Sequence, residues 1–389
     1  MTSNQGLGRF FSLKKETKEN IQKIYKRHIV FGNDLYSVDL YLYLLEKFGS
    51  DQVALFSRQK VTRESLKFEG PSLLRAKACK QYIQKIYPDV EFKEETKNPV
   101  FFKEGIFKEF GGRAKPEKLL WGEESFIEER ADFNEEDIFP FLKDQDLDKK
   151  LHENQFNYIP KEIVTLSPED LIDPKNFEIK STSGVHLSCE KLYMGTSTQS
   201  FLNLYTDKKE LSDEFIELCE QSKTPASLYI TFEFEKELTK NKETMFLPLS
   251  YTHEWGHFMG EFAPMREING RMTQVARFLN FLDIDHTNEE GISKKIRLLK
   301  RQLEKIFKNF KTISYTESIT LTESSMCLNF DDKDFAKIKK EFGNLIFVGA
   351  SAPLESFDLP SDSFEYSSKD LFYLARGVAS LVQIKNFLS

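Results

Sequence analysis

The stretch RHIVFGNDLYSVDLYLYLLEKFGSDQVALFSR, residues 27–58, decides the fold. It predicts a short strand at 28–31, a glycine turn, a helix and a second strand at 53–56. Apolar residues recur at helical spacing over 38–45, and Gly49 is placed to end the helix. Two apolar strands around an amphipathic helix indicate a right-handed βαβ unit with parallel strands. Such a unit near the start of a chain often opens a dinucleotide-binding domain.

The turn after the first strand keeps only part of the phosphate-binding fingerprint. In G-x-G-x-x-G, the glycines allow a tight turn, close approach of the pyrophosphate and close packing of helix on strand. Here the corresponding segment contains Gly32, Asn33, Asp34 and Ser37, so only the first glycine remains. Asp34 brings a negative charge to the pyrophosphate position. Ser37 is small enough to permit part of the close packing.

The end of the second strand also departs from a dinucleotide site. An acidic residue is expected there to bind a ribose hydroxyl, but the chain has Ser57 followed by Arg58. The pattern therefore favours the fold more strongly than the cofactor. A parallel sheet without a nucleotide remains open at this point.

Composition bounds the class of protein. The 389 residues are enough for two domains, or for one α/β unit with an inserted lobe. The net charge of −7 gives no general attraction to nucleic acid or anionic membrane. The four cysteines form no C-x-x-C pair, and the chain has neither a secretory signal pattern nor an apolar run of about 18 residues. We therefore expect a cytoplasmic protein with no membrane span and no nucleic-acid partner.

The remainder of the chain supplies a second lobe and then returns to the first. We expect a β-hairpin at 100–110 that turns at 103–105, strands at 228–234, 244–251 and 274–282, and an amphipathic helix at 291–310. Near the end, an apolar strand at 344–349 precedes a helix at 369–388. Small residues within that helix allow close approach to a sheet or a ligand.

The predicted fold is α/β, with a Rossmann-like domain of the dinucleotide-binding type and an inserted α+β domain of the substrate-binding type. After an N-terminal tail at 1–25, the first domain would be discontinuous and comprise 26–75, 176–200 and 340–389. The inserted domain would comprise the remaining segments, 76–175 and 201–339.

Four segments resemble the superfamily of flavin-dependent amine oxidases and protoporphyrinogen oxidases. They are HIVFGNDLYS with VALFSR, KLYMGTS, QVARFLNFLDIDHTNEEGISKKIRLLKRQLEKIF, and NLIFVGASAP with DLFYLARGVASLVQIKNFL. The resemblance implies FAD in the Rossmann-like domain and a small-molecule substrate beside the inserted lobe. It implies cofactor contacts at Gly32, Asn33, Asp34, Ser37, Ser57, Arg58, Gly195, Gly349, Ala350 and Gly377.

The chain departs from this family at the cofactor contacts themselves. Ala350 stands where the family has an aspartate that binds the ribityl chain, and Ser57 replaces the ribose-binding acid. Main-chain donors could still hold a flavin. The leading hypothesis is therefore an FAD-dependent oxidoreductase of the amine-oxidase-like class with a degenerate cofactor site. The alternative is a non-catalytic binding or scaffold protein on the same fold that has lost its flavin.

A third hypothesis is a zinc hydrolase, because residues 253–257 read H-E-W-G-H. On a helix, His253 and His257 would bind zinc and Glu254 would activate water. The β-rich residues before the motif favour a strand instead, in which His253, Trp255 and His257 would share one face. That face could line a substrate cavity, or the histidines could be structural. Arg113, after two glycines, is a further candidate contact for an anionic group, or a solvated side chain at a turn. Neither a catalytic residue nor the oligomeric state follows from the sequence.

Overall fold

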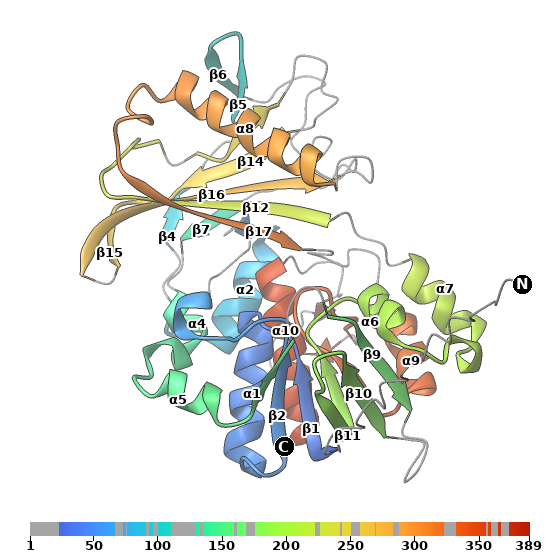
Figure 1. The fold of residues 1–389 in the computed structure, drawn as a ribbon. Helices are drawn as coiled ribbons and strands as arrows, with labels where there is room; N and C mark the ends of the chain where they lie inside the picture. The colour runs from blue at the N-terminus through green and yellow to red at the C-terminus, as the bar shows by residue number, and fades with distance from the viewer. Residues whose placement is uncertain are drawn as a thin grey trace, which may run out of the picture.

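The computed structural model describes residues 23–66, 73–74, 76–90, 93–95, 100–109, 129–132, 135–158, 162–168, 176–221, 226–241, 243–249, 257–268, 270–282, 288–322, 332–354, 357–358, 365–366 and 373–389. Two large sheets form two lobes, one above the other in Figure 1. The first strand and the last helix both belong to the lower lobe (Figure 1).

The first sheet has seven strands in the order β8-β2-β1-β11-β10-β9, with β18 also paired to β11. Its strands are β1 (Ile24–Phe31), β2 (Val53–Ser57), β8 (Gln155–Asn157), β9 (Val164–Pro168), β10 (Phe177–Ser181), β11 (His186–Met194) and β18 (Leu345–Phe347). Strand β1 pairs in parallel with both β2 and β11, which confirms the predicted βαβ unit. Strands β9 and β10 are antiparallel additions at one side.

Helices cover both faces of this sheet. Helices α1 (Leu35–Phe48) and α10 (Tyr373–Leu388) pack on one face. Helices α6 (Thr198–Leu204), α7 (Asp213–Gln221) and α9 (Asp332–Glu341) pack on the other (Figure 1). Helix α1 ends at Gly49, as predicted, because Gly49 adopts a φ of 84° and donates its N–H to the Leu45 carbonyl.

The second sheet has eight strands, in the order β17-β12-β16-β14-β13-β5-β6 with β15 paired to β16. Its strands are β5 (Val100–Lys103), β6 (Ile106–Glu109), β12 (Ala226–Phe234), β13 (Met245–Pro248), β14 (His257–Phe262), β15 (Arg266–Ile268), β16 (Arg271–Leu282) and β17 (Tyr315–Thr322). Helix α8 (Glu289–Ile306) covers the face away from the first lobe (Figure 1). The predicted hairpin is confirmed, and Glu104 and Gly105 make its turn with φ values of 57° and 82°.

Shorter elements complete the described structure. Strands β3 (Leu73–Leu74), β4 (Lys93–Glu95) and β7 (Glu129–Asp132) form a small sheet, and β19 (Phe357–Asp358) pairs with β20 (Glu365–Tyr366). The other helices are α2 (Ala76–Ile86), α4 (Glu135–Ile138) and α5 (Leu147–His152), with single 3₁₀ turns η1 (Arg63–Ser65), η2 (Pro140–Lys143) and η3 (Lys208–Glu210). None of the helices in the described part of the chain is both long and apolar enough to cross a membrane.

Several segments of the predicted inserted domain lie with the first sheet. Strand β8 pairs in parallel with β2, and β9 pairs with β10, although both fall within 76–175. Helices α6 and α7, which fall largely within 201–339, pack on the same sheet. Strands β8 and β9 provide hydrogen-bond partners for the backbone N–H and C=O groups of β2 and β10 at the two sides of this sheet. Residue patterns alone do not reveal which strands pair in this way.

Candidate functional site

Three glycines meet at one edge of the first sheet. Gly32, Gly195 and Gly349 follow the carboxyl ends of β1, β11 and β18 at that edge. Ligands of open α/β sheets bind outside the carboxyl ends of their strands. The structure therefore brings these three glycines, which come from distant segments, to the same end of the sheet.

Ser37 fills the space between two of these glycines. A Cβ on Gly32 would overlap the Ser37 hydroxyl and lie 2.9 Å from its Cβ. A Cβ on Gly195 would overlap the same hydroxyl and lie 3.2 Å from the Phe31 carbonyl oxygen. Ser37 is fully buried. Close packing of helix on strand, the role of the third fingerprint glycine, is thus retained with a serine.

Asp34 occupies the N-terminus of helix α1 with its own carboxylate. Its Oδ1 accepts the backbone N–H of Ser37 at 2.7 Å, so Asp34 is the N-cap of the helix. Burial raises the pKa of Asp34 to about 6, even though hydrogen bonds from Ser37 and Tyr36 favour the charged form. A helix N-terminus is where a dinucleotide fold binds pyrophosphate. In this chain a side-chain carboxylate already fills that role.

Tyr36 closes the space between α1 and α10. A Cβ on Gly377 would overlap the Tyr36 ring and lie 2.7 Å from its hydroxyl oxygen. Tyr36 is 5% exposed and makes an edge-to-face contact with Phe139 at 5.5 Å between ring centroids. Burial raises the pKa of Tyr36 well above its usual value, and nearby Asp34 and Tyr229 raise it further. Gly377 is therefore needed to admit a side chain of this protein, Tyr36.

Arg376 holds the loop that follows β18. It is fully buried, and its guanidinium donates to the carbonyl oxygens of Ala350 at 3.2 Å and Ala352 at 3.0 Å. Gly349, with a φ of 103°, donates its N–H to the Ser380 hydroxyl at 2.9 Å. Buried carbonyls require such donors. The loop is fixed by inward-facing hydrogen bonds, and Ala350 adds no polar side chain where the family has its aspartate.

The sequence reading missed Arg376, although an arginine within an apolar, small-residue helix was a visible signal. Such a residue cannot be buried without hydrogen-bond acceptors. The sequence does not show which hydrogen-bond acceptors Arg376 contacts.

The end of β2 offers little to a ribose. Ser57 is buried, and its Oγ lies 2.6 Å from the Gln59 carbonyl oxygen and 3.2 Å from Asn157 Oδ1. Gln155 Nε2 donates to the Ser57 Oγ at 3.4 Å. Arg58 is exposed, as is Asn33 in the first turn. The Ser57 hydroxyl is thus engaged within the protein.

Apolar side chains join the two lobes beside Tyr36. Phe246, Met259, Leu279 and Tyr229 lie directly opposite one another along β13, β14, β16 and β12. All four are buried, and they belong to one hydrophobic cluster with Tyr36 and residues of the first lobe such as Val348 and Leu354. This row is the face of the second sheet opposite α8. It places core-like packing between the lobes, next to the predicted cofactor residues.

The predicted substrate residues are only partly within the described residues. His253, Trp255 and Arg113 lie outside them. His257 is the first residue of strand β14, opposite Pro248, so the end of the H-E-W-G-H motif is a strand. Its carbonyl oxygen accepts from Asn280, whose side-chain oxygen accepts from the buried Lys295 at 2.8 Å. Among the described residues, no group of three or more His, Cys, Asp or Glu side chains could hold a metal ion.

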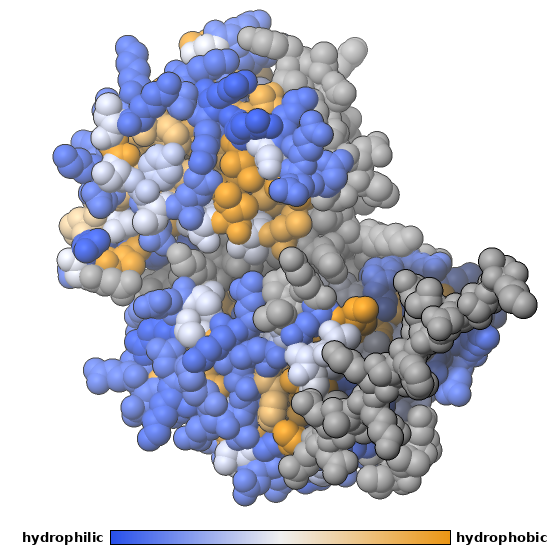
Figure 2. All heavy atoms as spheres, in the orientation of Figure 1, coloured by the Kyte–Doolittle hydropathy of each residue, from blue (hydrophilic) through white to orange (hydrophobic). Residues whose placement is uncertain are grey.

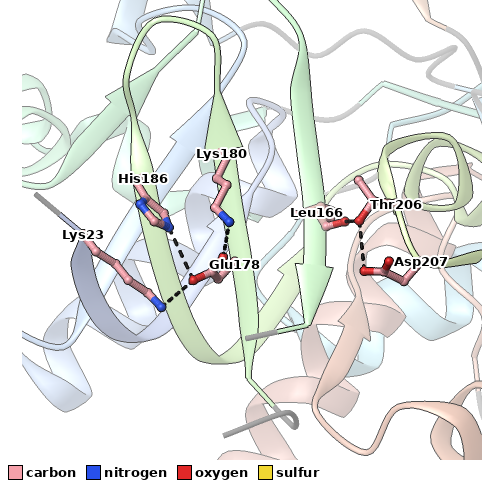
Figure 3. A network of polar contacts seen from close by, with 7 residues as sticks. All are labelled: Lys23, Leu166, Glu178, Lys180, His186, Thr206 and Asp207. Atoms are coloured by element: carbon pink, nitrogen blue, oxygen red, sulfur yellow. Dashed lines mark hydrogen bonds and ion pairs between the residues drawn. The ribbon is translucent and has the colours of Figure 1, made fainter. Parts of the chain in front are cut away.

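A polar network on β10 and β11 has a structural role. Figure 3 shows Glu178 between Lys23, Lys180 and His186, with Lys23 Nζ at 2.5 Å from its carboxylate. Burial opposes ionisation of Glu178, yet the hydrogen bonds and charges of Lys180 and Lys23 outweigh it and lower its pKa to about 2. The network ties the residue before β1 to the antiparallel side of the sheet.

Comparison with known proteins supports the fold. No protein-family model and no curated protein matches the sequence. A crystal structure of an oxidoreductase from Methanosarcina mazei aligns with a TM-score of 0.51 at 10% identity, covering 92% of this chain and 100% of that chain. A triple mutant of putrescine oxidase aligns with a TM-score of 0.50 at 8% identity, covering 94% of this chain and 99% of that one.

These alignments define the class of the fold. The chain shares its overall fold with an oxidoreductase and with putrescine oxidase, which agrees with the Rossmann-like α/β fold that the sequence predicted. At such low identity the likeness concerns the fold, and the chemistry depends on the residues that line the site.

The residues at the sheet edge do not fit the pyrophosphate of FAD. The N-terminus of α1, where this fold would bind the pyrophosphate, already holds the Asp34 carboxylate. The negative charge of a pyrophosphate would be repelled by an ionised Asp34. The Tyr36 ring occupies the contact with α10. The Asp34 carboxylate also reaches the third strand end, since its Oδ2 lies 3.8 Å from the position that a Cβ on Gly349 would take. The Asp34 carboxylate thus lies at the helix N-terminus, where the fold would offer backbone N–H groups to a phosphate.

Proposed function

We propose that this chain is a non-catalytic binding or scaffold protein built on the fold of flavin-dependent oxidoreductases. The observation that carries the proposal is the Asp34 carboxylate at the N-terminus of α1, in the place of a phosphate. The packing of Tyr36 against Gly377 supports it, because the same region is then filled by an aromatic ring. A protein with this fold and without flavin would act through its surface.

Visible absorbance and FAD titration test this proposal. We expect the purified, untagged wild-type protein to be colourless and to bind added FAD more weakly than about 100 µM. Replacing Asp34 with Gly removes the carboxylate and restores the second fingerprint glycine. We expect Asp34→Gly to tighten FAD binding about tenfold, a change of roughly 1.4 kcal/mol. Near-stoichiometric flavin bands in the wild type would overturn the proposal.

The second candidate is an FAD-dependent oxidoreductase acting on a small-molecule substrate. The retained close packing of Gly32, Ser37 and Gly195 favours it, because that packing shapes the first turn as in a dinucleotide site. It requires the Asp34 carboxylate to leave the helix N-terminus. Flavin in the purified protein would support this candidate.

The net charge of −7 and the separated cysteines support two accompanying proposals, a cytoplasmic location and the absence of a nucleic-acid partner. The third sequence hypothesis, a zinc hydrolase, would be supported by stoichiometric zinc in elemental analysis of the same sample.

A further inference from the structure

Strand β17 forms one side of the second sheet and is built for pairing. Its eight residues pair with β12 along their whole length, and among the described residues no strand pairs with its other side. The sequence YTESITLT contains no Lys, Pro or Gly, and it is rich in β-branched residues. Natural sheets protect long free edges with short strands, prolines or charged side chains, especially lysines, and Glu317 is the one charged residue of β17.

The other sheet edges carry such protection. At the opposite side of the same sheet, β6 has four residues and includes Lys108. In the first sheet, β8 has three residues and β9 ends in Pro168. Strand β17 therefore differs from the other edges in length and in composition.

A groove runs along β17 beside helix α8. It has a volume of about 820 Å³ and is lined by Glu317 and Ile319 from β17. The rest of its lining comes from the N-cap and one face of α8: Asn288, Glu289, Glu290, Ser293, Ile296, Arg297 and Lys300. Ile319 is 47% exposed and Leu321 is 48% exposed, so apolar side chains face solvent here. Figure 2 shows an apolar area bordered by hydrophilic atoms in this region of the upper lobe. An apolar area with a polar border is typical of a protein interaction site.

The charges beside the groove change sign along α8. Glu289 and Glu290 lie in its first turn, whereas Arg297 and Lys300 lie two to three turns later. Lys300 forms an ion pair with Glu317 of β17. A partner of uniform charge would be repelled at one end of the groove. A partner with the reversed order of charges would match both ends.

We propose that the side of β17 with no strand partner among the described residues is a homodimer interface, at which a second copy of this chain pairs antiparallel with the first. Directly opposite residues of antiparallel strands face the same side of a sheet. A two-fold axis perpendicular to the sheet can therefore place Ile319 opposite Ile319 of the second copy, with Glu317 opposite Leu321.

The two α8 helices would then run antiparallel on the same face of a continuous sheet. The acidic start of each helix would approach the basic middle of the other, and the apolar side chains of Ile319 and Leu321 would become covered. This surface is separate from the edge that holds Asp34, so the inference does not depend on whether flavin binds.

Sedimentation equilibrium of the full chain tests the proposal. We expect a dimer at about 10 µM, and Ile319→Lys should raise the dissociation constant at least tenfold. Ile106→Lys is the matched control, because Ile106 is 57% exposed on β6 at the opposite edge of the same sheet. Circular dichroism confirms that each variant is folded. A monomeric wild type at about 100 µM, or a dimer that Ile319→Lys leaves intact, would overturn the proposal.

Charge exchange tests the orientation of the two copies. The variant Glu289→Lys with Glu290→Lys and the variant Arg297→Glu with Lys300→Glu should each dimerise at least tenfold more weakly. A mixture of the two should recover dimerisation, since each helix start again meets opposite charge. Dimers that form equally well in all three samples would rule out this orientation.

Discussion

The carboxyl edge of the first sheet and the free edge of the second differ in what covers them. At the first, the Asp34 carboxylate caps the start of α1, and the Tyr36 ring packs between α1 and α10. At the second, Ile319 and Leu321 remain about half exposed beside an open groove. The strand ends where we predict cofactor contacts carry side chains of the protein itself, whereas Ile319 and Leu321 of β17 lie at the surface. Binding is therefore expected at the open edge.

The largest effect should come from removing the side chain that closes the first edge. Tyr36→Ala deletes a buried ring that packs against Gly377 and Phe139. We expect the free energy of unfolding to fall by about 3–5 kcal/mol, measured by urea denaturation.

Tyr36→Phe is the control for this prediction. It removes only a buried hydroxyl that has no hydrogen-bond partner among the described residues, so stability should change by less than about 0.5 kcal/mol. A large loss in Tyr36→Phe would mean that the hydroxyl, and not the ring, stabilises the contact.

A smaller effect should follow from filling the glycine contact beneath Ser37. Gly195→Ala places a Cβ against the Ser37 hydroxyl, and we expect a loss of about 1–3 kcal/mol in unfolding free energy. Ser37→Gly in the same chain should restore part of that stability, which a double-mutant cycle measures. The control is Gly343→Ala, because no atom lies within 4 Å of a Cβ there and the change should be nearly neutral. Additive effects of the two substitutions would contradict the contact.

The charge of Asp34 should make stability depend on pH. Its pKa is about 6 in the folded protein and close to 3.8 when unfolded, so the folded state holds the proton more tightly. Wild-type stability should therefore fall as the pH rises from about 4 to about 6. The Asp34→Asn variant lacks the titrating carboxyl group. The Tm of the variant minus the Tm of the wild type should therefore increase from about pH 4 to about pH 6 and then stay constant. A difference in Tm that does not change with pH would show that Asp34 is ionised throughout.

The smallest effect should come from the polar network of Glu178 in Figure 3, which belongs to neither region. The pKa of Glu178 is about 2 in the folded protein against 4.5 unfolded, so its contribution is present above pH 4.5 and is lost as the pH falls toward 2. Since its lysine partners are partly exposed, Glu178→Gln should lower stability by only about 1 kcal/mol or less at pH 7. A difference from the wild type that persists at pH 2 would mean that charge is not its basis.

Several features of both lobes were predictable from local pattern. The βαβ unit, the helix end at Gly49 and the hairpin turn at residues 104–105 depend on residues close together in the chain. The meeting of Gly32, Gly195 and Gly349 followed from the resemblance to a family with that arrangement. The position of β8 and β9 in the first sheet, and not in the inserted domain, was not predictable. Short strands without a clear residue pattern pair with whichever sheet edge is available to them.

The sequence by itself determined that Asp34 and Ala350 depart from a flavin site, since residue type alone gives charge and polarity. Only the tertiary structure decided that the Asp34 carboxylate caps α1, that Tyr36 meets Gly377 and that Arg376 holds the loop after β18. The same is true of the exposed edge of β17. These features join segments far apart in the chain, and close packing, which depends on the positions of atoms, determines which side chains fill a given space.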